Sequence, residues 1–247
     1  MMSRMSSIFT LDITLQRRYG FYYAGVFVTL VWIVLLKLLP ASWYGMAVPF
    51  VIFIDLGVIG LYFLAGQVIF EKMEGTLNAL VVSPLRFREY LLSKLITLTF
   101  LSWIISMIVA VVTVGLSFDI LIFSLGVITT SVLVLSVGMF AVIPYSSISS
   151  FIMPSQLYLI PITLPIIDFI GWIQSPLVYL IPTHASLLLL KGAFSSIGPW
   201  DLVYSLVYPP LWIVLFFIVS EKRFHKYVIA GGSSAVRPEG GKKDEYE

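Results

Sequence analysis

The fold is decided by the apolar run VPFVIFIDLGVIGLYFLAGQVIF (residues 48–70), which leads directly into the polar island EKMEGTLNALVVSPLRFREYLLSK (residues 71–94). A helix of this many apolar residues can cross the hydrocarbon core of a bilayer, which is about 30 Å thick. The island holds seven charged residues in twenty-four positions, and a second long apolar run follows it. The sequence therefore predicts two membrane-spanning helices joined by a charged segment at a membrane surface.

The composition of the chain is that of a membrane protein. Hydrophobic residues make up 59% of its 247 residues and charged residues 11%, and the mean hydropathy is +1.00. Soluble domains are about half apolar and about a quarter charged. A formal net charge of +2 is too small to indicate nucleic-acid binding. We therefore expect membrane lipids as partners and no nucleic acid.

Six apolar runs are long enough to cross a bilayer as helices. Their approximate bounds are residues 19–39, 48–70, 95–116, 120–143, 151–170 and 202–219. Barrel strands alternate apolar and polar residues, whereas these runs are continuously apolar. We therefore predict an all-α membrane protein whose six transmembrane helices form one domain, residues 19–220.

The basic residues are distributed unequally between the two sides that six spans create. Thirteen Lys and Arg residues fall on the side of the termini and the island, and the opposite side has only Lys37 and Lys191. Loops rich in Lys and Arg stay in the cytoplasm. We therefore predict a multi-pass protein of the cytoplasmic (inner) cell membrane with both termini in the cytoplasm.

Three segments outside the spans have patterns of their own. Residues 1–18 carry apolar residues at helical spacing with Asp12 and Gln16 between them, which predicts an amphipathic helix at the inner membrane interface. Residues 171–200 contain a short apolar piece interrupted by Pro182, which predicts a re-entrant hairpin on the outer side, with an ordinary outer loop as the alternative. Residues 221–247 form a cytoplasmic tail, in which we expect disorder from residue 231.

The sequence contains no motif for catalysis or nucleotide binding. The ATP-binding loop GxxxxGK[ST] and the hydrolase motifs HExxH and GxSxG are absent, there is no cysteine, and His184 and His225 lie in separate regions. Asp55 and Asp168 are acidic residues within apolar runs and have no evident partner. We therefore predict that the chain is not an enzyme and holds no metal and no cofactor.

Two features of the spans are candidates for a role in transport. Asp55 lies about 10 Å from the outer end of its predicted span, and charges at such depth usually face a bundle interior or a water-filled cavity. Asp55 is therefore a candidate pathway residue, and a structural carboxyl group near the interface is the alternative. Ser102, Ser106 and Ala110 recur every four residues, so this face would pack against another helix of the chain or against a second copy.

The island divides into two short predicted helices. Leu77 and Leu80 lie at helical spacing after a turn at Gly75, which predicts a helix with one apolar face. Ser83 followed by Pro84 is typical of a helix start, so a second helix would begin there and continue into the third span. A partner that grips the first helix would move both adjoining spans. The alternative is a solvated loop whose charges only set the topology.

The island closely resembles the loop between the second and third spans of ABC-2 type transporter permeases. The resemblance lies in Glu71-x-x-x-Gly75-Thr76-Leu77-x-x-Leu80-x-x-Ser83-Pro84-Leu85, with Glu89-Tyr90-Leu91 and Lys94 after it. The N-terminal helix, the six spans and the outer hairpin extend the likeness over nearly the whole chain. Residues 182–194 also look like the corresponding stretch of drug-export members, including fluoroquinolone-type exporter permeases. The chain differs from full-length exporters in having no fused nucleotide-binding domain.

The resemblance implies one half of a transporter that exports a lipophilic or amphipathic compound. A separate ABC ATPase subunit would bind ATP and Mg and push on a coupling helix in the island, and a second permease chain, identical or paralogous, would complete the pathway. The residues implied in this coupling are Glu71, Glu74, Gly75, Thr76, Leu77, Leu80, Ser83, Pro84, Arg86 and Arg88. A secondary transporter or channel, and a membrane assembly protein that moves no cargo, are the alternatives.

Overall fold

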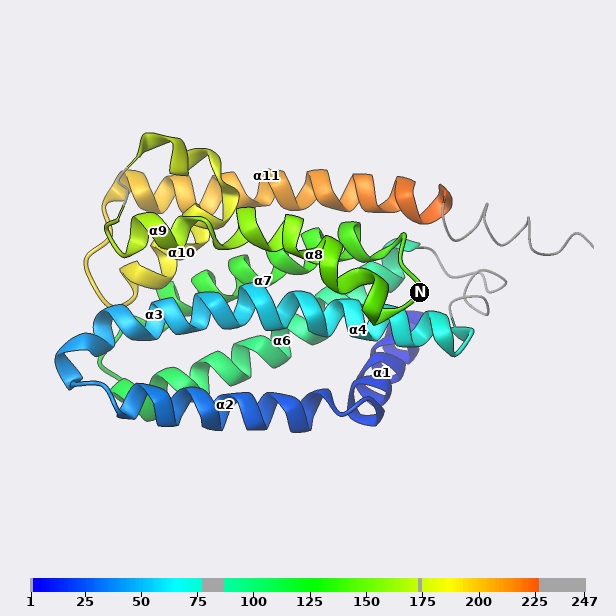
Figure 1. Cartoon of the computed structure of the whole chain (residues 1–247), viewed down its shortest axis with the longest axis horizontal. Coiled ribbons are helices and arrows are strands. Elements are labelled where there is room, and N and C mark those ends of the chain that lie inside the picture. Colours follow the sequence, from blue (N-terminus) through cyan, green and yellow to red (C-terminus); the bar gives the residue numbers. More distant parts are fainter. Residues whose placement is uncertain (1, 77–86, 173–174, 227–247) are drawn as a thin grey trace, which may run out of the picture.

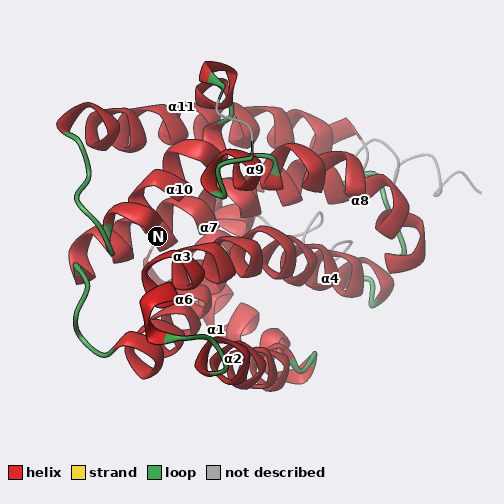
Figure 2. Ribbon diagram, turned by 60° about the vertical axis from the view of Figure 1, so that its left-hand side comes forward, coloured by secondary structure: helices red, strands yellow, loops and turns green. Residues whose placement is uncertain are grey.

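The computed structural model describes residues 2–76, 87–172 and 175–226, and within these ranges the chain is helical and contains no strand (Figure 1, Figure 2). The all-α prediction is therefore confirmed. The tail from residue 227, and with it the predicted disorder, lies outside the described residues.

The N-terminal half consists of two helices and a third, longer helix that is interrupted by a π-helical turn. These elements are α1 (Met2–Arg18), α2 (Phe21–Lys37), η1 (Ala41–Trp43), α3 (Tyr44–Ile54), the π-helical η2 (Asp55–Ile59) and α4 (Gly60–Met73). Gly20 has a φ of 79°, a left-handed conformation that glycine adopts at little cost. The chain bends by 62° between α1 and α2. Because of this bend, α1 lies across one end of the bundle (Figure 1).

The C-terminal half begins with the longest single α-helix of the described chain, α6. Its elements are α6 (Phe87–Val114), α7 (Ile120–Val142), α8 (Ile148–Thr163), α9 (Pro165–Phe169), the 3₁₀-helix η3 (Pro176–Leu180), α10 (Pro182–Gly192) and α11 (Pro199–Phe224). Asp119 precedes α7, and its carboxylate accepts hydrogen bonds from the first backbone N–H groups of that helix. α7 lies at the centre of the bundle and contacts α4, α6, α10 and α11.

Five helices are long and apolar enough to cross a membrane: Ala41–Met73, Phe87–Val114, Ile120–Val142, Ile148–Phe169 and Pro199–Phe224. α2 has 17 residues and reaches that length only when it is counted together with α1. Five or six spans agree with the predicted six, and the multi-pass membrane class is confirmed. The second span starts earlier than predicted, because the helix continues through Pro49 toward Ala41.

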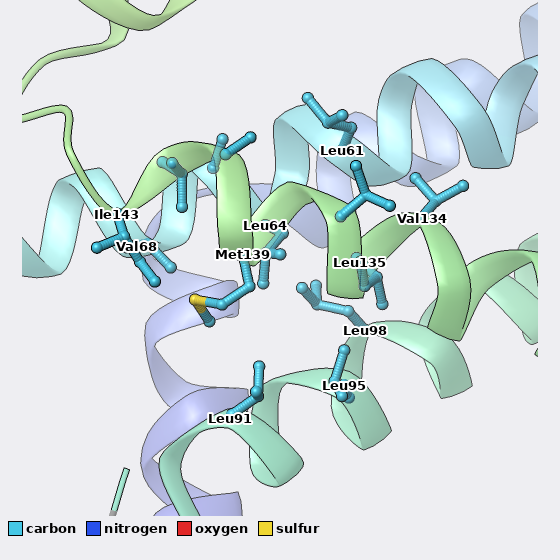
Figure 3. Packing of buried hydrophobic residues seen from close by; sticks show 14 of the residues in the cluster. Leu61, Leu64, Val68, Leu91, Leu95, Leu98, Val134, Leu135, Met139 and Ile143 are labelled. Atoms are coloured by element: carbon cyan, nitrogen blue, oxygen red, sulfur yellow. The ribbon is translucent and has the colours of Figure 1, made fainter. Parts of the chain in front are cut away.

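Two hydrophobic cores hold the bundle together, one toward each end. The first joins α4, α6 and α7, and Figure 3 shows part of it: Leu61, Leu64, Val68, Leu91, Leu95, Leu98, Val134, Leu135, Met139 and Ile143. The second includes the buried side chains of Phe53, Phe123 and Leu187. The outward faces of α2 and α11 are apolar and exposed, which is expected of helices in contact with lipid.

The region of the predicted hairpin contains η3 and α10, which meet at Ile181. α10 is largely buried and contacts α3, α7 and α11. The hydroxyl group of Thr183 donates a hydrogen bond of 2.9 Å to the carbonyl oxygen of Ile162. Two short helical pieces agree in outline with a hairpin, and its re-entrant position in a membrane stays a prediction.

The end of α4, the start of α6 and the end of α11 lie together at the end of the bundle that α1 crosses (Figure 1). Arg88 of α6 is paired there with Glu221 of α11. Lys37, predicted for the opposite side, donates a hydrogen bond to the carbonyl oxygen of Thr113 near the far end of α6. The predicted separation of basic residues therefore follows the long axis of the bundle, and the assignment of one end to the cytoplasm stays a prediction.

Candidate functional site

Three charged side chains meet in the interior where α1, α4 and α6 converge. The Nζ atom of Lys94 lies 2.8 Å from Oδ1 of Asp12 and 2.5 Å from Oε1 of Glu71. The side chains of Lys94, Asp12 and Glu71 are 0%, 3% and 2% exposed, respectively. We call Asp12, Glu71 and Lys94 the ion cluster.

Neutral side chains complete the hydrogen bonding of both carboxylates. Nε2 of Gln67 donates to Oδ1 of Asp12 at 3.0 Å and to Oε1 of Glu71 at 3.3 Å. The hydroxyl group of Ser93 donates to Oδ2 of Asp12, and that of Tyr90 donates to Oε2 of Glu71 at 2.7 Å. Every carboxylate oxygen of the ion cluster therefore accepts at least one hydrogen bond, which offsets part of the cost of burying charge.

A further layer of hydrogen bonds links the ion cluster to α2. Nε2 of Gln16 donates to Oγ1 of Thr97 at 2.9 Å and to Oε1 of Gln67 at 3.3 Å. The hydroxyl group of Tyr22, at the start of α2, donates to Oε1 of Gln16 at 3.3 Å. The polar network around the buried ammonium group of Lys94 therefore connects four helices, α1, α2, α4 and α6.

The ion cluster joins α1, α4 and α6 into one unit. Moving α1 away from α6 would separate Asp12 from Lys94, and breaking a buried ion pair costs about 3–5 kcal/mol. The helices are therefore expected to shift together when one of them is pushed. This is a mechanical role, since Lys94 and the neutral side chains around it already supply hydrogen bonds to both carboxylates.

The inward position of Asp12 and Gln16 was not predicted from the sequence. The helical spacing of Ile8, Leu11, Leu15 and Tyr19 predicted an amphipathic helix at the inner membrane interface, with Asp12 and Gln16 between the apolar residues. In such a helix the polar residues face water. In the structure Asp12 and Gln16 are buried together with Ile8 and Leu15, and Leu11 is 42% exposed. The signal that could have revealed the network is the helical spacing of polar residues in three separate segments: Asp12 and Gln16; Gln67 and Glu71; Tyr90, Ser93, Lys94 and Thr97.

Two exposed ion pairs lie at the same end of the bundle. Nη2 of Arg18 is 2.9 Å from Oε1 of Glu74, which joins the end of α1 to the end of α4. The guanidinium group of Arg88 makes two hydrogen bonds to the carboxylate of Glu221, at 2.8 and 3.1 Å. Exposed pairs contribute little to stability, because water and salt screen them.

Five of the ten predicted coupling residues belong to the described part of the chain. The carboxylate of Glu71 turns into the ion cluster, so Glu71 does not offer a surface charge to a partner. Glu74 and Arg88 are exposed and take part in the ion pairs just described. Gly75 has a φ of 72°, in agreement with the predicted turn after α4, and Thr76 is half-buried next to it. The other predicted residues, Leu77, Leu80, Ser83, Pro84 and Arg86, lie outside the described residues.

Asp55 occupies the first position of the π-helical turn η2. Because the span begins at Ala41, Asp55 is about 21 Å from that end at 1.5 Å per residue, which is deeper than predicted. The indole Nε1 of Trp32 in α2 donates a hydrogen bond of 2.8 Å to Oδ1 of Asp55. The sequence showed no partner for this carboxylate, and the structure supplies one from a different helix.

The small residues of α6 pack inside the chain. Ser106 and Ala110 are 1% and 0% exposed, and α6 contacts both α2 and α3. Ser102 is half-buried. Ser106 and Ala110 are therefore used for packing within the chain, which was one of the two alternatives for this face.

A carboxylate and an imidazole meet near the opposite end of the bundle. Nε2 of His184 lies 3.3 Å from Oδ2 of Asp168, so Asp168 has a partner that the sequence did not reveal. Burial of His184 lowers the pKa of its imidazole, and the hydrogen bond to Asp168 opposes this effect. Within the described residues there is no group of three or more His, Cys, Asp or Glu side chains that could hold a metal ion.

Comparison with known proteins identifies the family of the chain. Residues 3–232 match the fluoroquinolones export permease protein family. Two relatives named fluoroquinolones export permease protein, from Mycobacterium tuberculosis strains CDC 1551 / Oshkosh and ATCC 25618 / H37Rv, are each 35% identical over 234 residues, which cover 92% of this chain and 98% of the relative. No solved structure matches the chain. The chain therefore belongs to the fluoroquinolones export permease family and is an ABC-2-type export permease, as the residues of its polar island indicated.

Proposed function

We propose that this chain is the membrane subunit of an ATP-driven exporter that moves a lipophilic or amphipathic compound outward. In this proposal a separate ATPase subunit binds ATP and Mg, docks on the island 71–94 and pushes it when ATP binds. A second permease chain, identical or paralogous, completes the pathway. Membership of an export permease family supports this function, and the relatives named for fluoroquinolone export make such drug-like compounds the first to test.

The observation that carries the proposal is the position of the ion cluster. Residues 77–86, where the coupling helix is predicted, connect α4 to α6. Glu71 is close to the end of α4 and Lys94 is close to the start of α6, so their ion pair joins the two helices that flank this segment. Asp12 adds α1 to the same unit. A partner that pushes on residues 77–86 would therefore move α1, α4 and α6 together. The ion pairs would oppose the bending of one helix alone.

The coupling is tested by co-expressing the chain with an ATPase subunit that carries a GxxxxGK[ST] loop. We expect the two to co-purify, and the permease to stimulate ATP hydrolysis in liposomes. Leu77→Asp and Leu80→Asp should abolish both effects while the permease still inserts, because a charge would replace the apolar contact face. Leu211→Ala is the matched control, since Leu211 is 63% exposed on α11. Normal stimulation by the Asp variants would contradict the proposal.

The proposed orientation can be tested because the chain has no native cysteine. Met73 and Leu116 are 67% and 72% exposed and lie near opposite ends of the bundle. A membrane-impermeant maleimide added to intact cells should label Leu116→Cys and should leave Met73→Cys unlabelled until the membrane is opened. The reverse pattern would place the island outside the cell.

A secondary transporter is the second candidate, because the ion cluster supplies the paired ionisable groups that ion-coupled transport uses. The two functions differ in what drives them. Export by the permease and its ATPase in liposomes should require ATP and persist when an ionophore removes the proton gradient. Export that stops with the ionophore and continues without ATP would favour the secondary transporter.

A further inference from the structure

Asp55 is a carboxylate deep within a span, and its hydrogen bonding within the described residues is incomplete. Oδ1 accepts the hydrogen bond from Trp32, and among the described residues no hydrogen bond to Oδ2 and no ion pair with a basic side chain is present. Charged groups inside a membrane are costly, and they usually face a bundle interior or a cavity that gives them a partner. A half-satisfied carboxylate at this depth therefore has the capacity to bind a group from outside the chain.

A small cavity lies beside this carboxylate, between α2, the π-helical turn and α6. Its volume is about 20 Å³, and its walls include Gly25, Asp55, Gly60, Phe63 and Ser102. This is space for one water-sized group. A Cβ atom added to Gly60 would meet nothing within 4 Å, so the missing side chain at that position helps keep the space open.

The backbone at Asp55 also departs from regular α-helix. The chain changes from α-helix to a single π-helical turn at Asp55 and returns to α-helix at Gly60. π-helical turns inside α-helices occur frequently at functional sites. Trp32 holds one oxygen of the carboxylate in place through its indole, which leaves the other oxygen free to act.

We propose that Asp55 and the cavity beside it bind the positively charged amino group of the exported compound. The carboxylate supplies the opposite charge, the hydroxyl group of Ser102 supplies a hydrogen-bond acceptor, and the ring of Phe63 supplies an aromatic wall that favours cations. The rest of a drug-sized compound needs several hundred Å³, so it enters only when the helices separate further. This inference rests on the proposed function only in that the compound passes between these helices.

The test measures binding to the purified full-length permease in detergent, without ATP or an ATPase. The probes are a dansyl group joined by a hexyl chain to a primary amine, and the same molecule with the amine acetylated and neutral. The wild-type protein is expected to bind the amine about tenfold more tightly than the neutral probe, equivalent to about 1.4 kcal/mol. Asp55→Asn should remove this preference and leave the affinity for the neutral probe unchanged. Asp201→Asn, the same chemical change at the start of α11, should keep the preference.

A second variant separates a binding defect from a folding defect. Gly60→Leu keeps the carboxylate and fills the cavity, so it should also remove the preference for the amine while the protein elutes as one species in size-exclusion chromatography. Equal binding of both probes by the wild-type protein, or an intact preference in Asp55→Asn, would overturn the inference. Failure of ATPase coupling would leave these binding results unchanged, so the two proposals can fail independently.

Discussion

The ion cluster and Asp55 are two ways of placing charge inside the same bundle. In the ion cluster two carboxylates surround one ammonium group, and neutral donors occupy the remaining oxygens. Asp55 has one indole donor and an adjoining cavity. A group whose oxygens all accept hydrogen bonds within the chain is suited to holding helices together, whereas a group left half-satisfied can still bind a ligand. We therefore expect the ion cluster to hold helices together and Asp55 to belong to a binding site.

The comparison predicts different consequences for stability and for transport. Removing a member of the ion cluster leaves the others buried without a partner, which is strongly destabilising. Removing the charge of Asp55 relieves the cost of a charge at membrane depth and should affect the cargo more than the fold. Variants at the two places therefore test whether the ion cluster and Asp55 have different roles.

The largest effect is expected for Lys94→Met, which keeps the length of the side chain and removes its charge. Two buried carboxylates would then face each other without a counter-charge, so the free energy of unfolding should fall by about 3–5 kcal/mol. Denaturant unfolding of the purified protein in detergent measures this. Adding Asp12→Asn and Glu71→Gln to Lys94→Met should restore much of the loss. An unchanged stability of Lys94→Met would show that the ion cluster is not a joint.

Asp55→Asn should change the free energy of unfolding by less than about 1 kcal/mol, because the amide oxygen of Asn can still accept the hydrogen bond from Trp32. Export of an amine-bearing compound by liposomes that contain the ATPase should nevertheless be lost. The matched measurement is export of a neutral compound by the same preparation, which should continue. A loss of stability as large as that of Lys94→Met would instead make Asp55 a structural residue.

The membrane class and most helices could be predicted from the sequence, because continuous apolar runs determine where a chain can cross a bilayer. Interruptions within the helices were harder to predict. The predicted fifth span is divided into α8 and α9 at Leu164, and Pro165 is the first residue of the second piece. The sequence of the π-helical turn at Asp55 contains no proline and no polar run that would predict it. Such features arise from packing against other helices, which one segment of sequence does not contain.

The candidate site was predicted less completely than the fold. Glu71 and Lys94 were recognised as part of the island, and Asp55 was recognised as a charge at membrane depth. Asp12 was assigned to a surface, because its neighbours in sequence suggested an amphipathic helix in the membrane interface. The bend at Gly20 turns α1 across the end of the bundle and brings Asp12 to Lys94. Long-range geometry of this kind cannot be read from the spacing within one helix.

A smaller effect is expected at the exposed pair of Arg88 and Glu221. Both side chains are near water, so Arg88→Gln should leave the unfolding temperature nearly unchanged, and the slight decrease should disappear at high salt. Thermal unfolding at low and high salt measures this. If Arg88→Gln destabilised the protein as much as Lys94→Met does, burial would not be what distinguishes the ion cluster from its surroundings.

The smallest effect on stability is expected for His184. Its hydrogen bond to Asp168 is a third arrangement of ionisable side chains in this protein. Burial lowers the pKa of His184 below its ordinary value of 6.5, so its imidazole is mostly neutral at pH 7. Below about pH 6.5 the unfolded chain binds a proton before the folded chain does, and His184 then reduces stability as the pH falls. The chain has only two histidines, so His225→Gln leaves a single imidazole whose NMR shifts can be followed from pH 8 to 5. A midpoint below 6.5 is expected. A midpoint above 7 would instead show that His184 is charged in the folded protein and pairs with Asp168 as an ion pair.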